Sequence, residues 1–183
     1  MRHIRKISSA KEVVVLMDTT YWGRGFGLMI IKDAFRNKIL WYKFVKDETV
    51  SDYREGIEWL REHDFRIYGI VCDGMRVLFK EFRFYRIQMC QFHQIMIVRR
   101  YLTNSPDLQA SIELLPLSNK LSKISEIEFR NNLDEWHLRW SEFLCERTES
   151  NGHTQFTRQN VRKAYLSIVL HAISLDIWTL SGA

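Results

Sequence analysis

The sequence predicts an α/β protein in which a mixed five-stranded sheet is followed by an all-helical region. Two observations predict this class. The first half of the chain contains short, β-branched apolar runs that are separated by tight turns, as in sheets. From His93 onward the apolar residues recur at three- and four-residue steps, as on helices. The chain has 183 residues, of which 46% are hydrophobic, so a buried core is possible and wholesale disorder is excluded.

The first three predicted strands form an antiparallel meander. They cover residues 12–21, 26–31 and 39–45. The turn Gly23-Arg24-Gly25 separates the first two, and the polar segment 32–38 separates the second and third. The glycine-rich turn superficially resembles a phosphate-binding loop. Such loops open a helix, whereas an apolar strand follows here, so a hairpin turn is favoured.

A helix and two further strands are expected next. Ser51 is the predicted N-cap of a helix that ends near Asp64, with Tyr53, Ile57 and Leu60 at helical spacing on its apolar face. The remaining predicted elements of this part are a buried strand over 66–72, a short helix over 75–80 and a fifth strand over 83–89.

The rest of the chain is predicted to be helical. The expected helices cover 93–103, 107–123 with Asp107 as cap and Pro116 as a kink, a long amphipathic stretch from Ser125, and a last helix from Thr157 to about Ile173. A loop over 149–155 separates the last two. This order of strands and helices is that of an RNase H-like fold, a mixed five-stranded sheet with helices packed against it.

Two aspartates at strand ends are the predicted chemical centre. Asp18 and Asp73 each follow an apolar run, and an unpaired ionised carboxylate is costly to bury. In the predicted sheet the first and fourth strands are parallel neighbours, so both acids meet at one edge. Two like charges there favour a cation between them, and oxygen ligands suit Mg²⁺ or Mn²⁺. The alternative is that both acids serve turns or helix caps.

The motifs Asp18-Thr19-Thr20-Tyr21, Cys72-Asp73-Gly74 and Cys90-Gln91-Phe92-His93 together resemble Mutator-superfamily DDE transposases of bacterial insertion sequences. The resemblance runs from about Val13 to Ile173. It implies that Asp18 and Asp73 are catalytic metal ligands, and that Cys90 and His93 are a family signature after the fifth strand. It also implies that residues 1–103 are a partial RNase H-like catalytic core and that residues 104–183 belong to a helical insertion.

One departure from the family concerns its third acid. The family places a glutamate on a helix beyond the insertion, within a segment that is not found in this sequence, so the C-terminal catalytic helix is expected to be missing. Glu142 and Glu146 lie on the long helix, where a solvated face is expected. We therefore expect a fragment of a transposase that binds metal weakly and has little or no strand-transfer activity.

The function implied by the resemblance is metal-dependent cleavage and transfer of DNA strands in transposition. The partners would be transposon ends, target DNA and further copies of the chain. One alternative is another RNase H-like nuclease, such as a junction resolvase or exonuclease, which would need a third carboxylate within reach of Asp18 and Asp73. The other is a non-enzymatic remnant that binds DNA or a full-length partner and interferes.

The remaining signals are weaker. Cys90 and His93 have the spacing of half a zinc site, without a second pair of that spacing; His93 at the active-site rim or in a structural role is favoured. Arg99 and Arg100 could contact a DNA backbone or form a solvated face. The net charge of +5 permits a polyanionic partner. Three cysteines fit reduced thiols, and no apolar run could span a bilayer, so a cytosolic, nucleoid-associated location is expected.

Overall fold

The computed structural model describes residues 11–150 and 152–172. The chain divides into two compact units, Met1–Ile87 and Gln88–Ala183, and each is described by itself. The division into a partial catalytic core over 1–103 and a helical insertion over 104–183 was implied by the family resemblance, and it stays a prediction.

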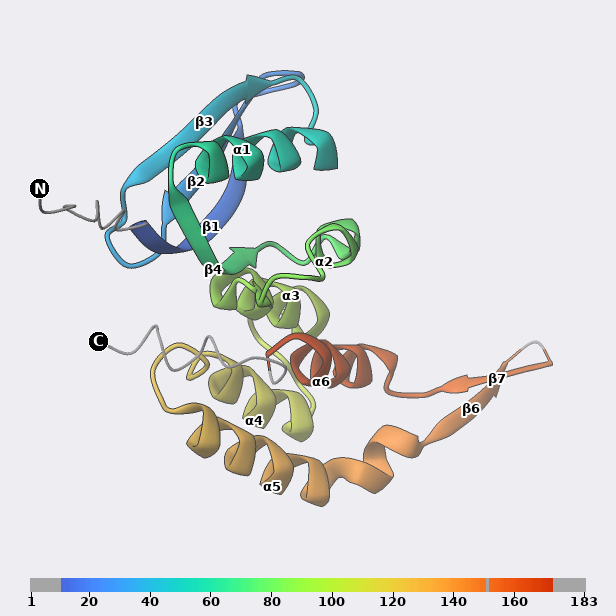
Figure 1. The fold of residues 1–183 in the computed structure, drawn as a ribbon. Coiled ribbons are helices and arrows are strands. Elements are labelled where there is room, and N and C mark those ends of the chain that lie inside the picture. The colour runs from blue at the N-terminus through green and yellow to red at the C-terminus, as the bar shows by residue number, and fades with distance from the viewer. Residues whose placement is uncertain (1–10, 151, 173–183) are drawn as a thin grey trace, which may run out of the picture. The chain divides into compact units, whose positions relative to one another are not determined.

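The first unit is built on the predicted mixed sheet, whose strand order is β3-β2-β1-β4-β5 (Figure 1). β1 pairs antiparallel with β2, β2 pairs antiparallel with β3, and β1 pairs parallel with β4. The fold class expected from the sequence is thus confirmed. The strands are β1 (Lys11–Tyr21), β2 (Gly27–Asp33), β3 (Ile39–Val45), β4 (Phe65–Cys72) and β5 (Ile87–Met89).

Helix α1 (Val50–Glu62) covers one face of this sheet (Figure 1). Its buried residues Tyr53, Ile57 and Leu60 are those that the helical spacing predicted. Gly56 lets the helix approach closely, because a Cβ there would lie 2.5 Å from Ile31 Cδ1. The core of this unit lies between α1 and the sheet.

The alternation of side chains separates two faces of the sheet. Val15 and Met17 of β1 are buried in the core with α1, and Thr19 reaches the Tyr53 hydroxyl. Since successive side chains point to opposite faces, Leu16 and Asp18 belong to the face away from α1. This assignment decides which side chains accompany Asp18.

Three local expectations in this unit were wrong. The N-cap of α1 is Thr49, not Ser51: Thr49 has extended backbone, and its side chain accepts the Asp52 N–H. The fifth strand covers only Ile87–Met89, because residues 82–86 turn, with the Tyr85 N–H bonded to the Phe82 carbonyl. The short helix α2 begins one residue late, at Arg76 (Arg76–Glu81). The Gly23–Gly25 segment is a hairpin turn as predicted, closed by the Trp22 N–H to the Phe26 carbonyl at 2.9 Å.

In its described residues, the second unit contains four helices around its own core. Trp136 is buried there, and its indole N–H donates to the Ala110 carbonyl at 3.0 Å. The long helix starts after Ser125, where the amphipathic stretch was expected to begin, and the Ser125 side chain caps it by accepting the Glu128 N–H. The helices are α3 (Gln91–Leu102), α4 (Gln109–Ser118), α5 (Glu126–Cys145) and α6 (Gln159–Ala172).

This unit is not all-helical, which corrects the sequence prediction. The segment expected to be a loop over 149–155 forms a hairpin of β6 (Arg147–Ser150) and β7 (His153–Phe156). Gly152, with φ of 75°, provides the turn between these two strands.

The caps expected at two helices of this unit were also wrong. Asp107 does not cap α4, whose N-cap is Leu108, and Pro116 lies inside that helix near its end. Thr157 lies before α6, and its hydroxyl meets that of Thr148 at 2.6 Å. The expected end of the last helix at Ile173 lies outside the described residues. Within 11–150 and 152–172, no helix is long and apolar enough to cross a membrane.

The corrected cap of α1 can be tested by a matched pair of substitutions. Thr49→Ala should lower the free energy of unfolding by about 1 kcal/mol, because the Asp52 N–H loses its acceptor. Ser51→Ala should change it by less than about 0.5 kcal/mol. Urea unfolding of both variants measures this difference. Equal losses for the two would show that Thr49 is not the cap.

Candidate functional site

The parallel register of β1 and β4 sets Asp18 and Asp73 at the same level. Leu16 pairs with Val71, and each aspartate lies two residues further along its chain. Asp18 is within β1, whereas Asp73 directly follows the last residue of β4. Both are partly buried. Neighbouring strands lie about 4.8 Å apart, so the two acids occupy adjacent positions at this end of the sheet.

Each aspartate also serves its local backbone. Asp18 Oδ1 accepts the Thr19 N–H at 3.0 Å. Asp73 Oδ1 accepts the Met75 N–H at 3.0 Å, just before α2. The turn-forming role weighed from the sequence is therefore real for Asp73. These bonds fix one oxygen of each carboxylate, and they orient both groups at the end of the sheet.

Glu48 is a third acid near this pair, and the sequence reasoning missed it. It lies between β3 and α1, and the buried Tyr53 hydroxyl donates to its Oε1. Tyr53 also contacts Thr19 Oγ1 at 2.9 Å. A chain of hydrogen bonds thus connects Glu48 to the residue next to Asp18.

Burial raises the pKa of Glu48 above its ordinary value, and the charges of Asp73 and Asp18 raise it further. Hydrogen bonds from Tyr53 and Thr19 oppose this increase in the pKa. The influence of both aspartates shows that the three carboxylates share one electrostatic environment. Burial also raises the pKa of Tyr53, with the Glu48 bond as the next cause, so its hydroxyl keeps its proton and remains a donor.

The spacing in the sequence held a weak signal for Glu48. Tyr53 is five residues later and on the buried face of α1, so an acid just before this helix has a hydroxyl within reach. The acids weighed from the sequence were those that directly follow an apolar strand and two on the long helix, Glu142 and Glu146. Glu48 follows Lys46 and Asp47, which look like ordinary turn residues.

The donor set fits a magnesium or manganese ion in its chemistry. Mg²⁺ is usually held by one or two carboxylates, with waters and substrate phosphates completing its shell. Asp18 and Asp73 provide such a pair of oxygen donors. Among residues 11–150 and 152–172, however, no three His, Cys, Asp or Glu side chains form a group that could hold a metal, so Glu48 does not complete a three-acid cage.

The other predicted site residues lie in the second unit. Cys90 is the N-cap residue of α3, and His93 is one turn further, partly buried, with its ring edge-on to Phe92. In the described chain His93 Nδ1 is buried and lacks a hydrogen-bond partner. No zinc cluster forms around either residue among the described positions.

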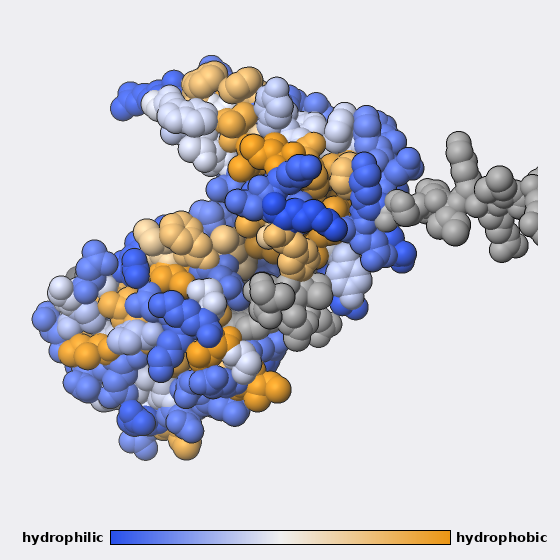
Figure 2. Space-filling view, turned by 90° about the vertical axis from the view of Figure 1, so that its left-hand side faces the viewer, coloured by the Kyte–Doolittle hydropathy of each residue, from blue (hydrophilic) through white to orange (hydrophobic). Residues whose placement is uncertain are grey.

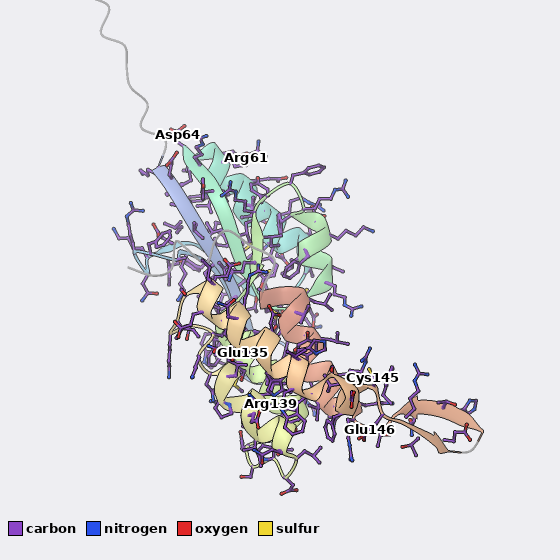
Figure 3. The ribbon with its side chains drawn as sticks, turned by 90° about the horizontal axis from the view of Figure 1, so that it is seen from below. Arg61, Asp64, Glu135, Arg139, Cys145 and Glu146 are labelled. Atoms are coloured by element: carbon purple, nitrogen blue, oxygen red, sulfur yellow. The ribbon has the colours of Figure 1, made fainter. Side chains whose placement is uncertain are left out.

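Arg99 and Arg100 are exposed in the last turn of α3. Arg99 donates to Asn119 Oδ1 at 3.0 Å. Glu146 follows the C-terminal end of α5, next to the exposed Cys145 (Figure 3), and it pairs with Arg158 at 3.3 Å. These contacts lie within the second unit. The DNA contact expected of Arg99 and Arg100 stays a prediction.

The raised pKa of Glu48 predicts a pH-dependent stability. The folded chain holds this proton to a higher pH than the unfolded chain, whose glutamate has the ordinary pKa of 4.5. The resulting stabilisation is fully present below pH 4.5 and is lost as the pH rises through the raised pKa. Glu48→Gln should therefore unfold at higher urea concentration than the wild type at neutral pH, and at a similar concentration near about pH 4.

Glu58→Gln, at an exposed position of α1, is the control for the loss of one negative charge. If Glu48→Gln is no more stable than the wild type at neutral pH, burial and the neighbouring charges do not disfavour the ionised Glu48 as described.

No protein-family model matches the chain, and no curated protein matches it. Among solved structures, the HTLV-2 integrase catalytic core domain in complex with magnesium matches in a dimeric form (TM-score 0.35, 15% identity, 64% of this chain and 89% of that one) and a trimeric form (0.36, 14%, 84% and 98%). The simian T-cell lymphotropic virus intasome in complex with the PP2A regulatory subunit B56 gamma matches with a TM-score of 0.36 and 14% identity. That alignment covers 63% of this chain and only 50% of the intasome chain. Because these TM-scores lie below 0.5, the likeness carries no argument about function.

Proposed function

We propose that this chain performs divalent-metal-dependent chemistry on DNA phosphodiesters, with Asp18 and Asp73 as the metal ligands. The observation that supports the proposal is the parallel register of β1 and β4, in which Leu16 pairs with Val71 and each aspartate follows two residues later. Two adjacent like charges favour a bound cation. The metal, when bound, would polarise the phosphate and stabilise charge in the transition state.

The protein's own residues would hold the metal and orient the two carboxylates that bind it. The Thr19 and Met75 N–H groups each donate to one carboxylate oxygen, Oδ1, which leaves the other oxygen of each aspartate available to a metal. Glu48, held by Tyr53, contributes negative charge beside the pair when it is ionised. A cation would relieve this repulsion, so metal binding should favour the ionised form of Glu48.

The finer proposal is a DDE transposase activity, impaired in this chain. It is supported by the ordered motifs around Asp18, Asp73 and Cys90–His93, which resemble Mutator-superfamily transposases. In this reading the partners are transposon ends and target DNA, further copies of the chain assist, and the cofactor is Mg²⁺ or Mn²⁺. Glu48 would be dispensable for the reaction, because the third acid of that family lies elsewhere.

The position of Glu48 favours a second candidate, a hydrolytic nuclease. Such an enzyme needs a further acid near Asp18 and Asp73, and Glu48 is influenced by both. In that reading the chain cuts DNA without transferring strands, and Glu48 is required. The two candidates thus differ in their dependence on one residue.

Cleavage of labelled DNA by the full chain in Mn²⁺ tests the proposal. Asp18→Asn and Asp73→Asn should each lower the cleavage rate by at least about 100-fold, because a metal that supplies several kcal/mol of charge stabilisation is lost. Cleavage that persists in both variants would contradict the proposed ligands.

Glu48→Gln in the same assay separates the two candidates. An equal loss of cleavage, with hydrolytic products only, would identify the nuclease. Retained cleavage, with joined products when target DNA is present, would identify the transposase reaction. Glu58→Gln is the matched control, since Glu58 is exposed on α1.

A further inference from the structure

Four exposed aromatic side chains form a continuous row at the β1–β2 turn and along β3. Phe26 stacks on Phe44, with ring centroids 5.5 Å apart and planes at 16°. Trp22 lies beyond Phe26 at 6.1 Å, and Tyr42 lies beyond Phe44 at 6.1 Å. The exposed fractions are 55% for Trp22, 50% for Phe26, 60% for Phe44 and 61% for Tyr42. Contiguous exposed apolar surface of this kind marks an interaction site.

The strand register connects this aromatic row to Asp18. Asp18 pairs with Ile30, and Ile30 pairs with Tyr42, so the three residues form one line across the sheet. They share the face away from α1, because the alternate residues of each strand face that helix. Two strand spacings separate Tyr42 from Asp18, which is about 10 Å. That distance corresponds to about three nucleotides at the 3.4 Å rise of a stacked strand.

Basic residues flank the aromatic row. Arg24 is exposed in the β1–β2 turn, between Trp22 and Phe26. Lys46 follows β3, and its side chain lies against the same turn, since a Cβ on Gly25 would be 3.7 Å from Lys46 Cγ. On the opposite face, by contrast, Lys43 is neutralised by Asp52 and Glu55. The row therefore combines flat π surfaces with cations, which suits a partner that has bases and phosphates.

We propose that the aromatic row is a stacking platform for the bases of single-stranded DNA, which it guides toward the carboxylates at the end of the sheet. Exposed aromatic side chains bind unpaired bases by stacking, and neighbouring cations hold the phosphates. A duplex keeps its bases stacked on one another, so it cannot use this platform. This inference rests on the proposed function, and it names the substrate as a single strand or an unpaired end.

Hydrophobic residues are also exposed elsewhere, as the face drawn in Figure 2 shows, and they provide a control. Phe84 is 86% exposed in the first unit, and its ring contacts Arg83 at 4.7 Å, so it too pairs an aromatic ring with a cation. Among the residues that the structure describes, Phe84 is not part of a row of contacting rings like that of Trp22, Phe26, Phe44 and Tyr42. Loss of Phe84 should therefore leave binding unchanged if a row of rings, rather than any exposed ring, is required.

Binding of a fluorescent oligo-dT strand to the full chain, in EDTA, tests the inference without needing cleavage. Phe44→Ala and Tyr42→Ala should each weaken the affinity about tenfold, because one stacked base is lost. Phe44→Tyr and Phe84→Ala should retain the affinity, and a duplex of the same length should bind more weakly. The fluorescence of Trp22 should be quenched by the strand and less so in Phe44→Ala.

Unchanged affinity in both alanine variants would overturn the proposal. So would sedimentation data in which Phe44→Ala dissociates an oligomer while binding to the strand is unaltered, since a second copy would then occupy the row. Because the assay contains no metal, its result is separate from the proposed catalysis. Loss of binding in the alanine variants would support the platform even if the wild type cut no DNA, and cutting with unaltered binding would refute the platform alone.

Discussion

The parallel pairing of β1 with β4 is the constraint on which the rest of the first unit depends. It brings together two segments that the chain separates by a meander and a helix, and it aligns Leu16 with Val71. Asp18 and Asp73 each lie two residues after this pair, so the register of the strands, not the side chains of the aspartates, determines their positions. The core of Val15, Ile70 and Leu60 holds this register, because a slip by one residue would move every apolar side chain to the opposite face. The geometry of the candidate site is thus a consequence of packing on the other side of the sheet.

That packing also affects the pKa of an acid near the site. Tyr53 is fully buried under α1, and its hydroxyl donates to Glu48, whose pKa is raised first by burial and further by the charges of Asp73 and Asp18. Neighbouring like charges destabilise the fold unless one is protonated or a cation is bound. Protonation of Glu48, or a cation bound beside it, would relieve the cost of its negative charge. The face away from α1 carries Asp18 together with the aromatic row, so one surface presents one of the two proposed ligands and the proposed stacking platform.

The sequence predicted the elements that depend on periodicity and on strand ends. The sheet, α1 with its buried Tyr53, Ile57 and Leu60, and the long helix that starts after Ser125 are confirmed, because each follows from local apolar spacing. The β6–β7 hairpin was missed, since its strands are polar and carry no apolar alternation. Glu48 was missed for another reason: its role depends on a hydroxyl five residues later and on two strands it does not belong to. Contacts that join three separate segments are set by tertiary packing, and no local pattern records them.

The proposed function depends most on Asp18 and Asp73 acting together as one metal site. A double-mutant cycle on Mn²⁺ affinity, measured by calorimetry, tests this coupling directly. Asp18→Asn and Asp73→Asn should each weaken Mn²⁺ binding strongly, and the double variant should bind Mn²⁺ hardly more weakly than either single variant. Losses of affinity that simply add, or affinities that do not change, would show that the two aspartates do not form one metal site.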